Sequence, residues 1–342
     1  MTRHHPVVHV VLSLLVLMMI SFACTAPGAR QPVLEPVTLR VVTLPRISYA
    51  PFYIAQEEGF FAEQALEIEF VEMKRSSEAI PALAQGDLDV VGGALSVGLL
   101  NAIAREARIK LVADKGHTAS SGCSSSVLIA RRELVEGGQL EDPAQLKGLR
   151  VSLNPAGFTG YYVEKLIAPF GLGLDDLEIL KHPAAVELEA LAEGAIDIIA
   201  TSEPWVTHIL QGGYGVIWLP VQDIVPGSQQ SLLWYGPSLL DENPEAGKRF
   251  MVAYLKAVRQ YNEGKTERNL EIMTNATELE RELLIEACWP RLRDDGGINA
   301  ESVLDFQSWA VDEGLLDIPI TEDQFWDPGF VEHANQALSS GD

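Results

Sequence analysis

The chain has 342 residues, more than one typical hydrophobic core holds, so its length predicts two lobes. Hydrophobic residues make up 47% and charged residues 21%, a composition typical of globular proteins rather than of disordered chains. The formal net charge of −23 leaves no basic stripe for phosphates, so we expect neither a nucleic-acid partner nor adsorption to anionic lipid.

The N-terminus has the layout of a secretory signal. Basic residues at positions 3–5 precede an apolar run over 7–23, which is short for a membrane span. The run ends just before Cys24, in a context similar to a bacterial lipobox, although Ser21 stands where that motif usually has Leu. We therefore expect lipidation of Cys24 and attachment to the outer face of the cell membrane, with an uncleaved anchor or ordinary cleavage left open. The expected segments are a signal peptide (1–23) and a Pro-rich lipoprotein tether (24–36).

Strand and helix patterns alternate after the tether. The predicted strands are 39–44, 66–71, 88–91 and 109–113, and the predicted helices are 51–61, 78–84 and 96–105. Gly59 is expected where the first helix stops. This order predicts an α/β fold with a largely parallel sheet and right-handed crossovers. The loop between the first strand and helix contains aromatic residues, as expected for a ligand-facing edge.

A second alternation follows a small, polar stretch over 116–126. Its predicted strands are 127–130, 149–153, 177–180, 196–200 and 216–219, and its predicted helices are 142–148, one opening after 157–160, 184–193 and 204–210. Segments 85–91 (Gln-Gly-Asp-Leu-Asp-Val-Val) and 193–199 (Glu-Gly-Ala-Ile-Asp-Ile-Ile) share one plan. We therefore expect the second unit to repeat the first, and the loops after both segments to face each other across a cleft.

The last third of the sequence no longer alternates. A strand over 232–235 is expected to return to the first lobe, and a helical tail on that lobe follows, with predicted helices 243–261, 267–274, 278–289 and 300–311. The expected domains are a first lobe (37–126 and 232–342) and a second lobe (127–231), with the chain crossings near 126–129 and 232–235 as the hinge.

The two remaining cysteines, Cys123 and Cys288, lie far apart in the sequence. They could pair outside the cytoplasm, but the sequence does not decide whether they meet. It has no CxxC pair and no histidine cluster with metal-ligand spacing, so we expect no metal and no cofactor.

Four segments together carry a family resemblance: Tyr-Ala-Pro-Phe-Tyr-Ile-Ala-Gln-Glu-Glu-Gly-Phe-Phe (49–61), Gln-Gly-Asp-Leu-Asp-Val (85–90), Leu-Lys-Gly-Leu-Arg-Val (146–151) and Gly-Ala-Ile-Asp-Ile-Ile-Ala-Thr-Ser-Glu-Pro-Trp (194–205). They resemble the substrate-binding proteins of bacterial ABC importers for nitrate, sulfonates and taurine, and relatives that bind thiamine pyrimidine precursors or riboflavin. The resemblance implies a two-lobe periplasmic binding protein fold of type 2. Its implied partners are a small molecule and a membrane permease, and we expect a monomer.

The same superfamily contains the eukaryotic thiamine-pyrimidine synthase, an enzyme that consumes its own histidine and carries a cysteine-rich iron motif. The corresponding region here, Met-Lys-Arg-Ser-Ser-Glu (73–78), has no histidine, and Cys123 stands alone among serines. We therefore expect a binding protein and no enzymatic activity, with an enzyme similar to the thiamine-pyrimidine synthase as a distant alternative.

The predicted cleft loops are rich in aromatic rings, which favours a planar heterocycle such as riboflavin or a thiamine pyrimidine precursor. Hydroxyl groups and Arg46 at helix starts leave an oxyanion such as a sulfonate, taurine or nitrate as the alternative. Glu203 would pair with an amine and repel an oxyanion, unless it only caps a helix. The candidate ligand-binding residues, led by Tyr49 and Trp205, are Arg46, Tyr49, Phe52, Ser96, Asn154, Thr159, Tyr161, Glu203, Trp205 and Tyr235.

Overall fold

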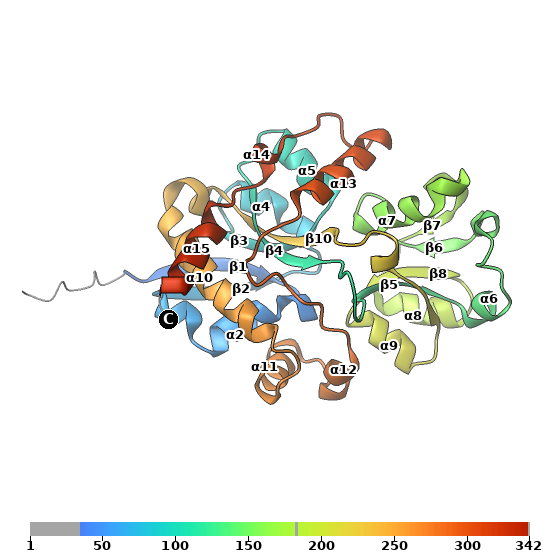
Figure 1. Ribbon diagram of the computed structural model, residues 1–342, viewed down its shortest axis with the longest axis horizontal. Helices are drawn as coiled ribbons and strands as arrows, with labels where there is room; N and C mark the ends of the chain where they lie inside the picture. Colours follow the sequence, from blue (N-terminus) through green and yellow to red (C-terminus); the bar gives the residue numbers. More distant parts are fainter. Residues whose placement is uncertain (1–34, 182–183, 341–342) are drawn as a thin grey trace, which may run out of the picture. The chain divides into compact units, whose positions relative to one another are not determined.

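The computed structural model describes residues 35–181 and 184–340 (Figure 1). The predicted signal peptide and Cys24 lie outside the described residues, as does the tether up to residue 34. In the described part of the chain, no helix is both long enough and apolar enough to cross a membrane.

The first sheet has five strands in the order β2-β1-β3-β10-β4. Its strands are β1 (Val37–Thr43), β2 (Leu66–Glu72), β3 (Val90–Ala94), β4 (Lys110–His117) and β10 (Gln229–Tyr235). β1 pairs in parallel with β2 and β3, and β10 is antiparallel to β3 and β4. β10 is thus the one strand that runs against the others, and it reaches this sheet from the second half of the chain.

The helices of the first alternation follow its strands, as predicted. They are α2 (Ala50–Glu57), α3 (Phe60–Glu63), α4 (Ile80–Ala84) and α5 (Val97–Ala104), with the 3-10 turns η1 (Ile47–Tyr49) and η2 (Ser76–Ala79). The helix expected over 51–61 is divided in two. Gly59 takes a left-handed backbone conformation with φ of 75°, which ends α2 and redirects the chain into α3.

The second sheet has the order β7-β6-β8-β5-β9, the same arrangement as the first. Its strands are β5 (Ser126–Ala130), β6 (Arg150–Ser152), β7 (Glu178–Leu180), β8 (Ile198–Ser202) and β9 (Val216–Pro220). Its helices are α6 (Arg132–Glu136), α7 (Phe158–Ile167), α8 (Ala184–Ala192) and α9 (Trp205–Gln211). β5 is antiparallel to β8 and β9, so each sheet contains one strand of opposite direction. Two mostly parallel sheets flanked by helices confirm the predicted fold class.

The predicted internal repeat is visible in two aspartates, Asp89 and Asp197, that make the same hydrogen bond between neighbouring strands. The Asp89 carboxylate accepts a hydrogen bond of 2.6 Å from the Arg40 amide, and the Asp197 carboxylate accepts one of 2.9 Å from the Arg150 amide. Each aspartate directly precedes the third strand of its alternation, β3 or β8, and ties it to the first strand, β1 or β6. The repeated Gly–Asp pattern therefore marks a strand connection and not a ligand site.

The helical tail consists of α10 (Pro244–Tyr261), α11 (Glu267–Thr277), α12 (Arg281–Glu286), α13 (Ala300–Asp312), α14 (Glu322–Phe325) and α15 (Gly329–Ser340). α10 packs against α2 and α15 on the first sheet's side (Figure 1). The helix expected over 278–289 is shorter, because the chain leaves helical geometry at Ala287 and Cys288 forms a disulfide with Cys123.

The tail also contacts the helices of the second sheet. The Tyr161 hydroxyl on α7 donates to the Asp305 carboxylate on α13, and Lys165 forms an ion pair of 2.9 Å with the same carboxylate. On α9, the Gln211 amide donates to Glu286 on α12 at 2.8 Å. The tail, expected on the first lobe, therefore also contacts helices α7 and α9 that flank the second sheet.

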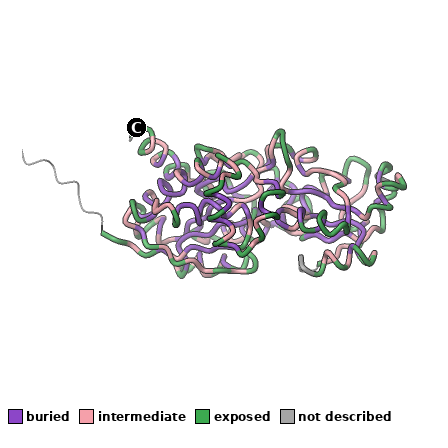
Figure 2. Tube along the Cα trace, turned by 90° about the horizontal axis from the view of Figure 1, so that it is seen from below, coloured by how far each residue is buried: buried purple, intermediate pink, exposed green. Residues whose placement is uncertain are grey.

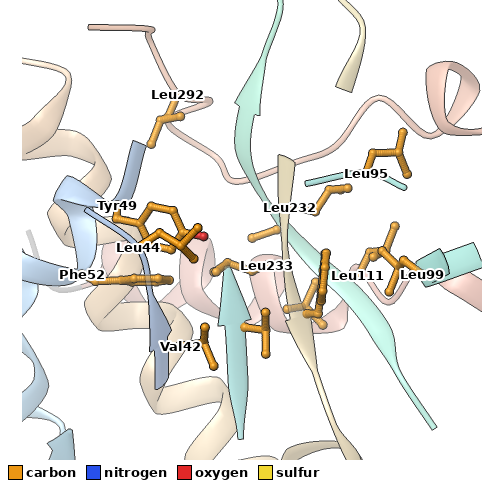
Figure 3. Packing of buried hydrophobic residues seen from close by; sticks show 14 of the residues in the cluster. Val42, Leu44, Tyr49, Phe52, Leu95, Leu99, Leu111, Leu232, Leu233 and Leu292 are labelled. Atoms are coloured by element: carbon orange, nitrogen blue, oxygen red, sulfur yellow. The ribbon is translucent and has the colours of Figure 1, made fainter. Parts of the chain in front are cut away.

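Buried positions are concentrated in central strands such as β3 and β5, whereas the edge strands β2, β7 and β9 are mostly half-buried or exposed. Figure 2 shows the buried stretches of the chain in purple. Val42, Leu233 and Phe52 form part of the main core around the first sheet, as Figure 3 shows. A smaller apolar cluster around Ile129 and Ile209 fills one side of the second sheet. These cores hold the carboxyl ends of the parallel strands in place.

Candidate functional site

The two sheets meet at loops that follow the carboxyl ends of their parallel strands. The Arg46 guanidinium, after β1, donates a hydrogen bond of 3.2 Å to the Ser202 hydroxyl at the end of β8. Ser96, after β3, forms a backbone bridge with Gly157, which follows β6. Because the two sheets share one topology, the contact is reciprocal, with the first-strand loop of one sheet meeting the third-strand end of the other. We call these loops (44–49, 94–96, 153–158 and 202–205) the inter-sheet site.

Four predicted polar residues lie in or next to this site. Arg46, Ser96 and Thr159 are half-buried, and Asn154 is exposed. The Ser96 hydroxyl caps α5 by accepting from the Leu99 amide at 3.3 Å. Thr159 accepts from the Asn154 amide at 2.9 Å, which fixes the turn that opens α7.

Lys115 lies directly behind this site, although the sequence did not single it out. It follows Asp114 near the end of β4, and only 2% of its surface is exposed. Its ammonium nitrogen donates to the Ser48 hydroxyl at 3.0 Å and lies 3.4 Å from the centroid of the Tyr49 ring. A side chain at Gly92 would come within 2.6 Å of Lys115 Cε, so this glycine makes room for the lysine.

Tyr49, a leading candidate, is 3% exposed, and Lys115 covers one face of its ring. Its hydroxyl donates to the Gly92 carbonyl oxygen. Burial raises the pKa of the Tyr49 phenol, so it remains a neutral donor. The structure therefore gives Tyr49 a role in positioning Lys115 and β3.

Three further predicted rings belong to the packing of the fold. Phe52 lies between Tyr49, Phe250 and Tyr254, and the fully buried Tyr235 donates its hydroxyl to the Gly247 carbonyl at 2.9 Å. Tyr161 packs against the tail rings Phe306 and Trp309. These three residues lie outside the proposed site, because other protein atoms already cover their side chains.

Glu203 is buried, and its carboxylate is fully engaged. It accepts hydrogen bonds from the Thr207 amide at 3.1 Å, the Thr207 hydroxyl at 3.0 Å and the Cys288 amide at 2.9 Å. Burial raises the pKa of Glu203, although these donors oppose the effect. Its carboxylate thus holds the disulfide-bonded tail segment against α9.

Trp205 begins α9 and is half-buried, with its ring 6.0 Å from the His208 ring. Of the six predicted rings and acids (Tyr49, Phe52, Tyr161, Glu203, Trp205 and Tyr235), it keeps the most exposed surface. Trp205 is therefore the one predicted aromatic residue with a ring surface that a ligand could contact.

Residues 46–263 match the NMT1/THI5-like family, and the chain belongs to this family. The bicarbonate-binding protein CmpA of Synechococcus elongatus is 24% identical over 265 residues, which cover 68% of this chain and 55% of CmpA. The chain thus spans about half the length of this curated relative.

Two other similarities are narrower or more distant. The riboflavin-binding protein RibY of Chloroflexus aurantiacus is 42% identical over 48 residues, only 14% of this chain and 13% of RibY. The structure of the periplasmic nitrate-binding protein NrtA of Synechocystis PCC 6803 superimposes with a TM-score of 0.72 at 15% identity, covering 89% of both chains. At that identity the likeness establishes the fold, which confirms the periplasmic binding protein architecture.

Proposed function

We propose that this protein is the extracytoplasmic substrate-binding component of an ABC importer and that its ligand is a small anion. The observation that carries the proposal is the pair of basic side chains, Arg46 and Lys115, at the inter-sheet site. Arg46 contacts Ser202 across the two sheets, and Lys115 lies behind Ser48. Among the ion pairs of the described residues, none includes Arg46 or Lys115, so a ligand would supply their counter-charge.

The contacts of the aromatic and acidic residues favour the anion over the planar heterocycle that the sequence favours. Four of the five predicted rings are covered by protein atoms, which leaves little surface for stacking. Glu203, the carboxylate expected to repel an anion, is turned to Thr207 and Cys288. The bicarbonate-binding relative and the nitrate-binding structural neighbour fit the same proposal.

Capture would follow from the two-sheet arrangement. An anion would bind first to the loop containing Arg46 and Ser48, and Ser202 and the α7 start would then close over it. The crossings between β4 and β5 and between β9 and β10 would act as the hinge, a few residues before the predicted positions 126–129 and 232–235, and all of β10 would belong to the first lobe. The protein would act as a monomer, without catalysis, held to the membrane through Cys24 and delivering the anion to its permease.

Arg46→Met tests the proposed ligand class. Loss of one charge-assisted contact should weaken anion binding about 10- to 100-fold. Titration calorimetry with nitrate, bicarbonate and methanesulfonate would measure it. Arg132→Met is the matched control, since Arg132 is exposed on α6 and pairs with Glu136. Unchanged affinity in Arg46→Met would contradict the proposal.

A planar heterocycle, riboflavin or a thiamine pyrimidine precursor, is the second candidate. The local similarity to RibY and the partly exposed ring of Trp205 favour it. On this alternative, Trp205→Ala should abolish most affinity for riboflavin, because stacking between the Trp205 ring and the ring system of the ligand would be lost. Quenching of flavin fluorescence would measure the affinity. Equal riboflavin binding by the wild type and Trp205→Ala would count against it.

A further inference from the structure

Lys115 occupies a position that is unusual for a charged side chain. It is almost completely buried, and within the part of the chain that the structure describes its Nζ atom has one hydrogen-bond partner, the Ser48 hydroxyl, and one ring contact, Tyr49. A lysine ammonium has three N–H donors, and burial without full pairing is costly. A feature of this kind is expected where a ligand completes the site.

The groups around Lys115 do not neutralise it. Its neighbour Asp114 is occupied by donors from elsewhere, since it accepts from the Gln229 amide at 2.6 Å, the Arg293 amide at 2.9 Å and His117 at 3.1 Å. Lys115 is not among these donors to Asp114.

The elements packed against Lys115 contribute little negative charge. The loop after β1 supplies the cation of Arg46 and the phenol of Tyr49, β3 supplies Gly92, and α2 supplies Phe52. The neighbouring strand β10, whose sequence is Gln-Gln-Ser-Leu-Leu-Trp-Tyr, contains no charged residue.

We propose that Lys115, acting through Ser48, recognises the anionic group of the ligand and gains one proton from solvent when that group binds. The inference rests on the proposed function and deepens it by naming the residue and the proton linkage. The proton passes from a buffer acid in the solvent to the neutral amine of the empty site, so an N–H bond forms on Lys115 as the bond to that proton in the buffer acid breaks, and the ligand supplies the balancing negative charge.

The geometry gives Ser48 the connecting role. Its oxygen accepts from Lys115, so its own hydroxyl hydrogen is free to point to the half-exposed side of the site. A hydroxyl that accepts from an ammonium is a stronger donor, since hydrogen bonds in a chain polarise one another. An anion bound at Ser48 and Arg46 would thus be stabilised by the positive charge of Lys115 through the Ser48 hydroxyl. The hydrogen bond between Lys115 and Ser48 would remain in place.

The electrostatics of the buried amine agree with this arrangement. Burial lowers the pKa of Lys115 well below 10.5, the positive charge of Arg46 lowers it further, and Asp114 partly opposes them. An anion beside Ser48 raises this pKa again. Binding therefore consumes a proton, and affinity must fall as the pH rises between the pKa of the empty site and that of the occupied site.

The test is titration calorimetry of the full mature chain with sodium nitrate and sodium methanesulfonate. Both are anions of strong acids, so any proton taken up on binding is taken up by the protein and not by the anion. Tris and triethanolamine are suitable buffers because they differ in ionisation enthalpy and are not anions. The dependence of the binding enthalpy on the buffer gives the protons taken up. We expect roughly 0.5–1 proton per anion and up to about tenfold weaker binding per pH unit above the pKa of the empty site.

Three variants separate Lys115 from general charge effects. Lys115→Met should abolish the proton uptake and weaken binding about 10- to 100-fold, and Ser48→Ala should reduce both. Lys147→Met is the control, because Lys147 is exposed, pairs with Asp176 and precedes the amino end of β6. It should bind as the wild type does.

A second measurement does not depend on any ligand. The 13Cε resonance of Lys115, assigned by its loss in Lys115→Met, reports the protonation of the amine in the empty protein. Titration near pH 10.5 would overturn the inference. Anion binding without proton uptake, or equal binding by Lys115→Met, would overturn it and leave the proposed function standing. Absence of binding with both anions would instead overturn the proposed function and the inference with it.

Discussion

Lys115 shows how one residue can favour function at the expense of stability. Its amine is buried beside the cation of Arg46, which lowers its pKa in the folded protein. A base with a lowered pKa destabilises the fold at neutral pH, and the cost shrinks as the pH rises toward 10.5, the value for the unfolded chain.

Lys115→Met should therefore raise the free energy of unfolding of the empty protein by about 1–3 kcal/mol at pH 7, since Met keeps the volume of the side chain. The gain should be smaller at pH 10. Urea unfolding at both pH values would measure it. A variant that is less stable than the wild type, or a gain independent of pH, would contradict the account.

Tyr49 provides a second test at this scale. Tyr49→Phe removes the donor to the buried Gly92 carbonyl, which should cost about 1–2 kcal/mol of stability in urea unfolding. The ring under Lys115 stays, so nitrate affinity should change by less than about threefold. A large loss of affinity with unchanged stability would instead make the Tyr49 hydroxyl a ligand contact.

The sequence indicated part of this site and could not indicate the rest. Arg46 and Ser96 follow predicted strands, so their place at a strand end could be inferred from the pattern. Lys115 lies beyond the predicted end of its strand at Ala113, whereas β4 continues to His117. Its contact with Ser48 joins positions 67 residues apart, and no local pattern reports such a contact. Extending the strand by two residues would have placed a lysine at the same edge.

An aspartate links two neighbouring strands of each sheet, Asp89 in the first sheet and Asp197 in the second. Asp197 accepts hydrogen bonds from the Arg150 amide and guanidinium and from Arg131, whereas Asp89 accepts from the Arg40 amide and lies 3.8 Å from its guanidinium. The two residues are equivalent in position but not in the number of their partners.

Asp197→Asn should therefore lower the free energy of unfolding by about 2–4 kcal/mol, and Asp89→Asn by about half as much. Burial would raise the pKa of Asp197, but Arg150 and Arg131 lower it below 3.8. The contribution of Asp197 is thus present above pH 3.8 and is lost as the pH falls below it. Urea unfolding of both variants at pH 7 and pH 3 would check this; equal losses for both would contradict the ranking.

The pattern of elements was largely predictable, because each strand and helix carries its own periodicity and stop signals. The strand order and the antiparallel strands β5 and β10 depend on where the chain crosses between sheets, which periodicity does not encode. The contact of the tail with α7 depends on Tyr161, Phe306 and Asp305 meeting in space. Tyr161 was expected to face a ligand because its ring alone does not reveal which surface covers it.

At the scale of the whole molecule, the Cys123–Cys288 disulfide joins positions separated by 165 residues, and the sequence had left this pairing open. It ties the polar stretch that precedes β5 to the tail, beside the Glu203 carboxylate. The bond thus links the crossing between the sheets to the helices that contact both of them.

Removing this bond should lower the free energy of unfolding by about 2–5 kcal/mol, because the unfolded chain loses a long closed loop. Calorimetric unfolding with and without a phosphine reductant would measure the change. The double variant Cys123→Ser with Cys288→Ser should have the same unfolding temperature as the reduced protein, and the reductant should not change it. An unfolding temperature that is the same for the oxidised, reduced and double-variant proteins would show that the bond adds no stability.

We propose that the two sheets close on a small anion. Titration calorimetry of the mature chain with nitrate, bicarbonate, methanesulfonate, riboflavin and a thiamine pyrimidine precursor tests it most directly. We expect saturable one-to-one binding of at least one of the three anions, weakened in Arg46→Met and unaffected in Arg132→Met, with no heat from riboflavin or the pyrimidine. Binding of riboflavin or the pyrimidine, together with no response to any of the three anions, would contradict the claim.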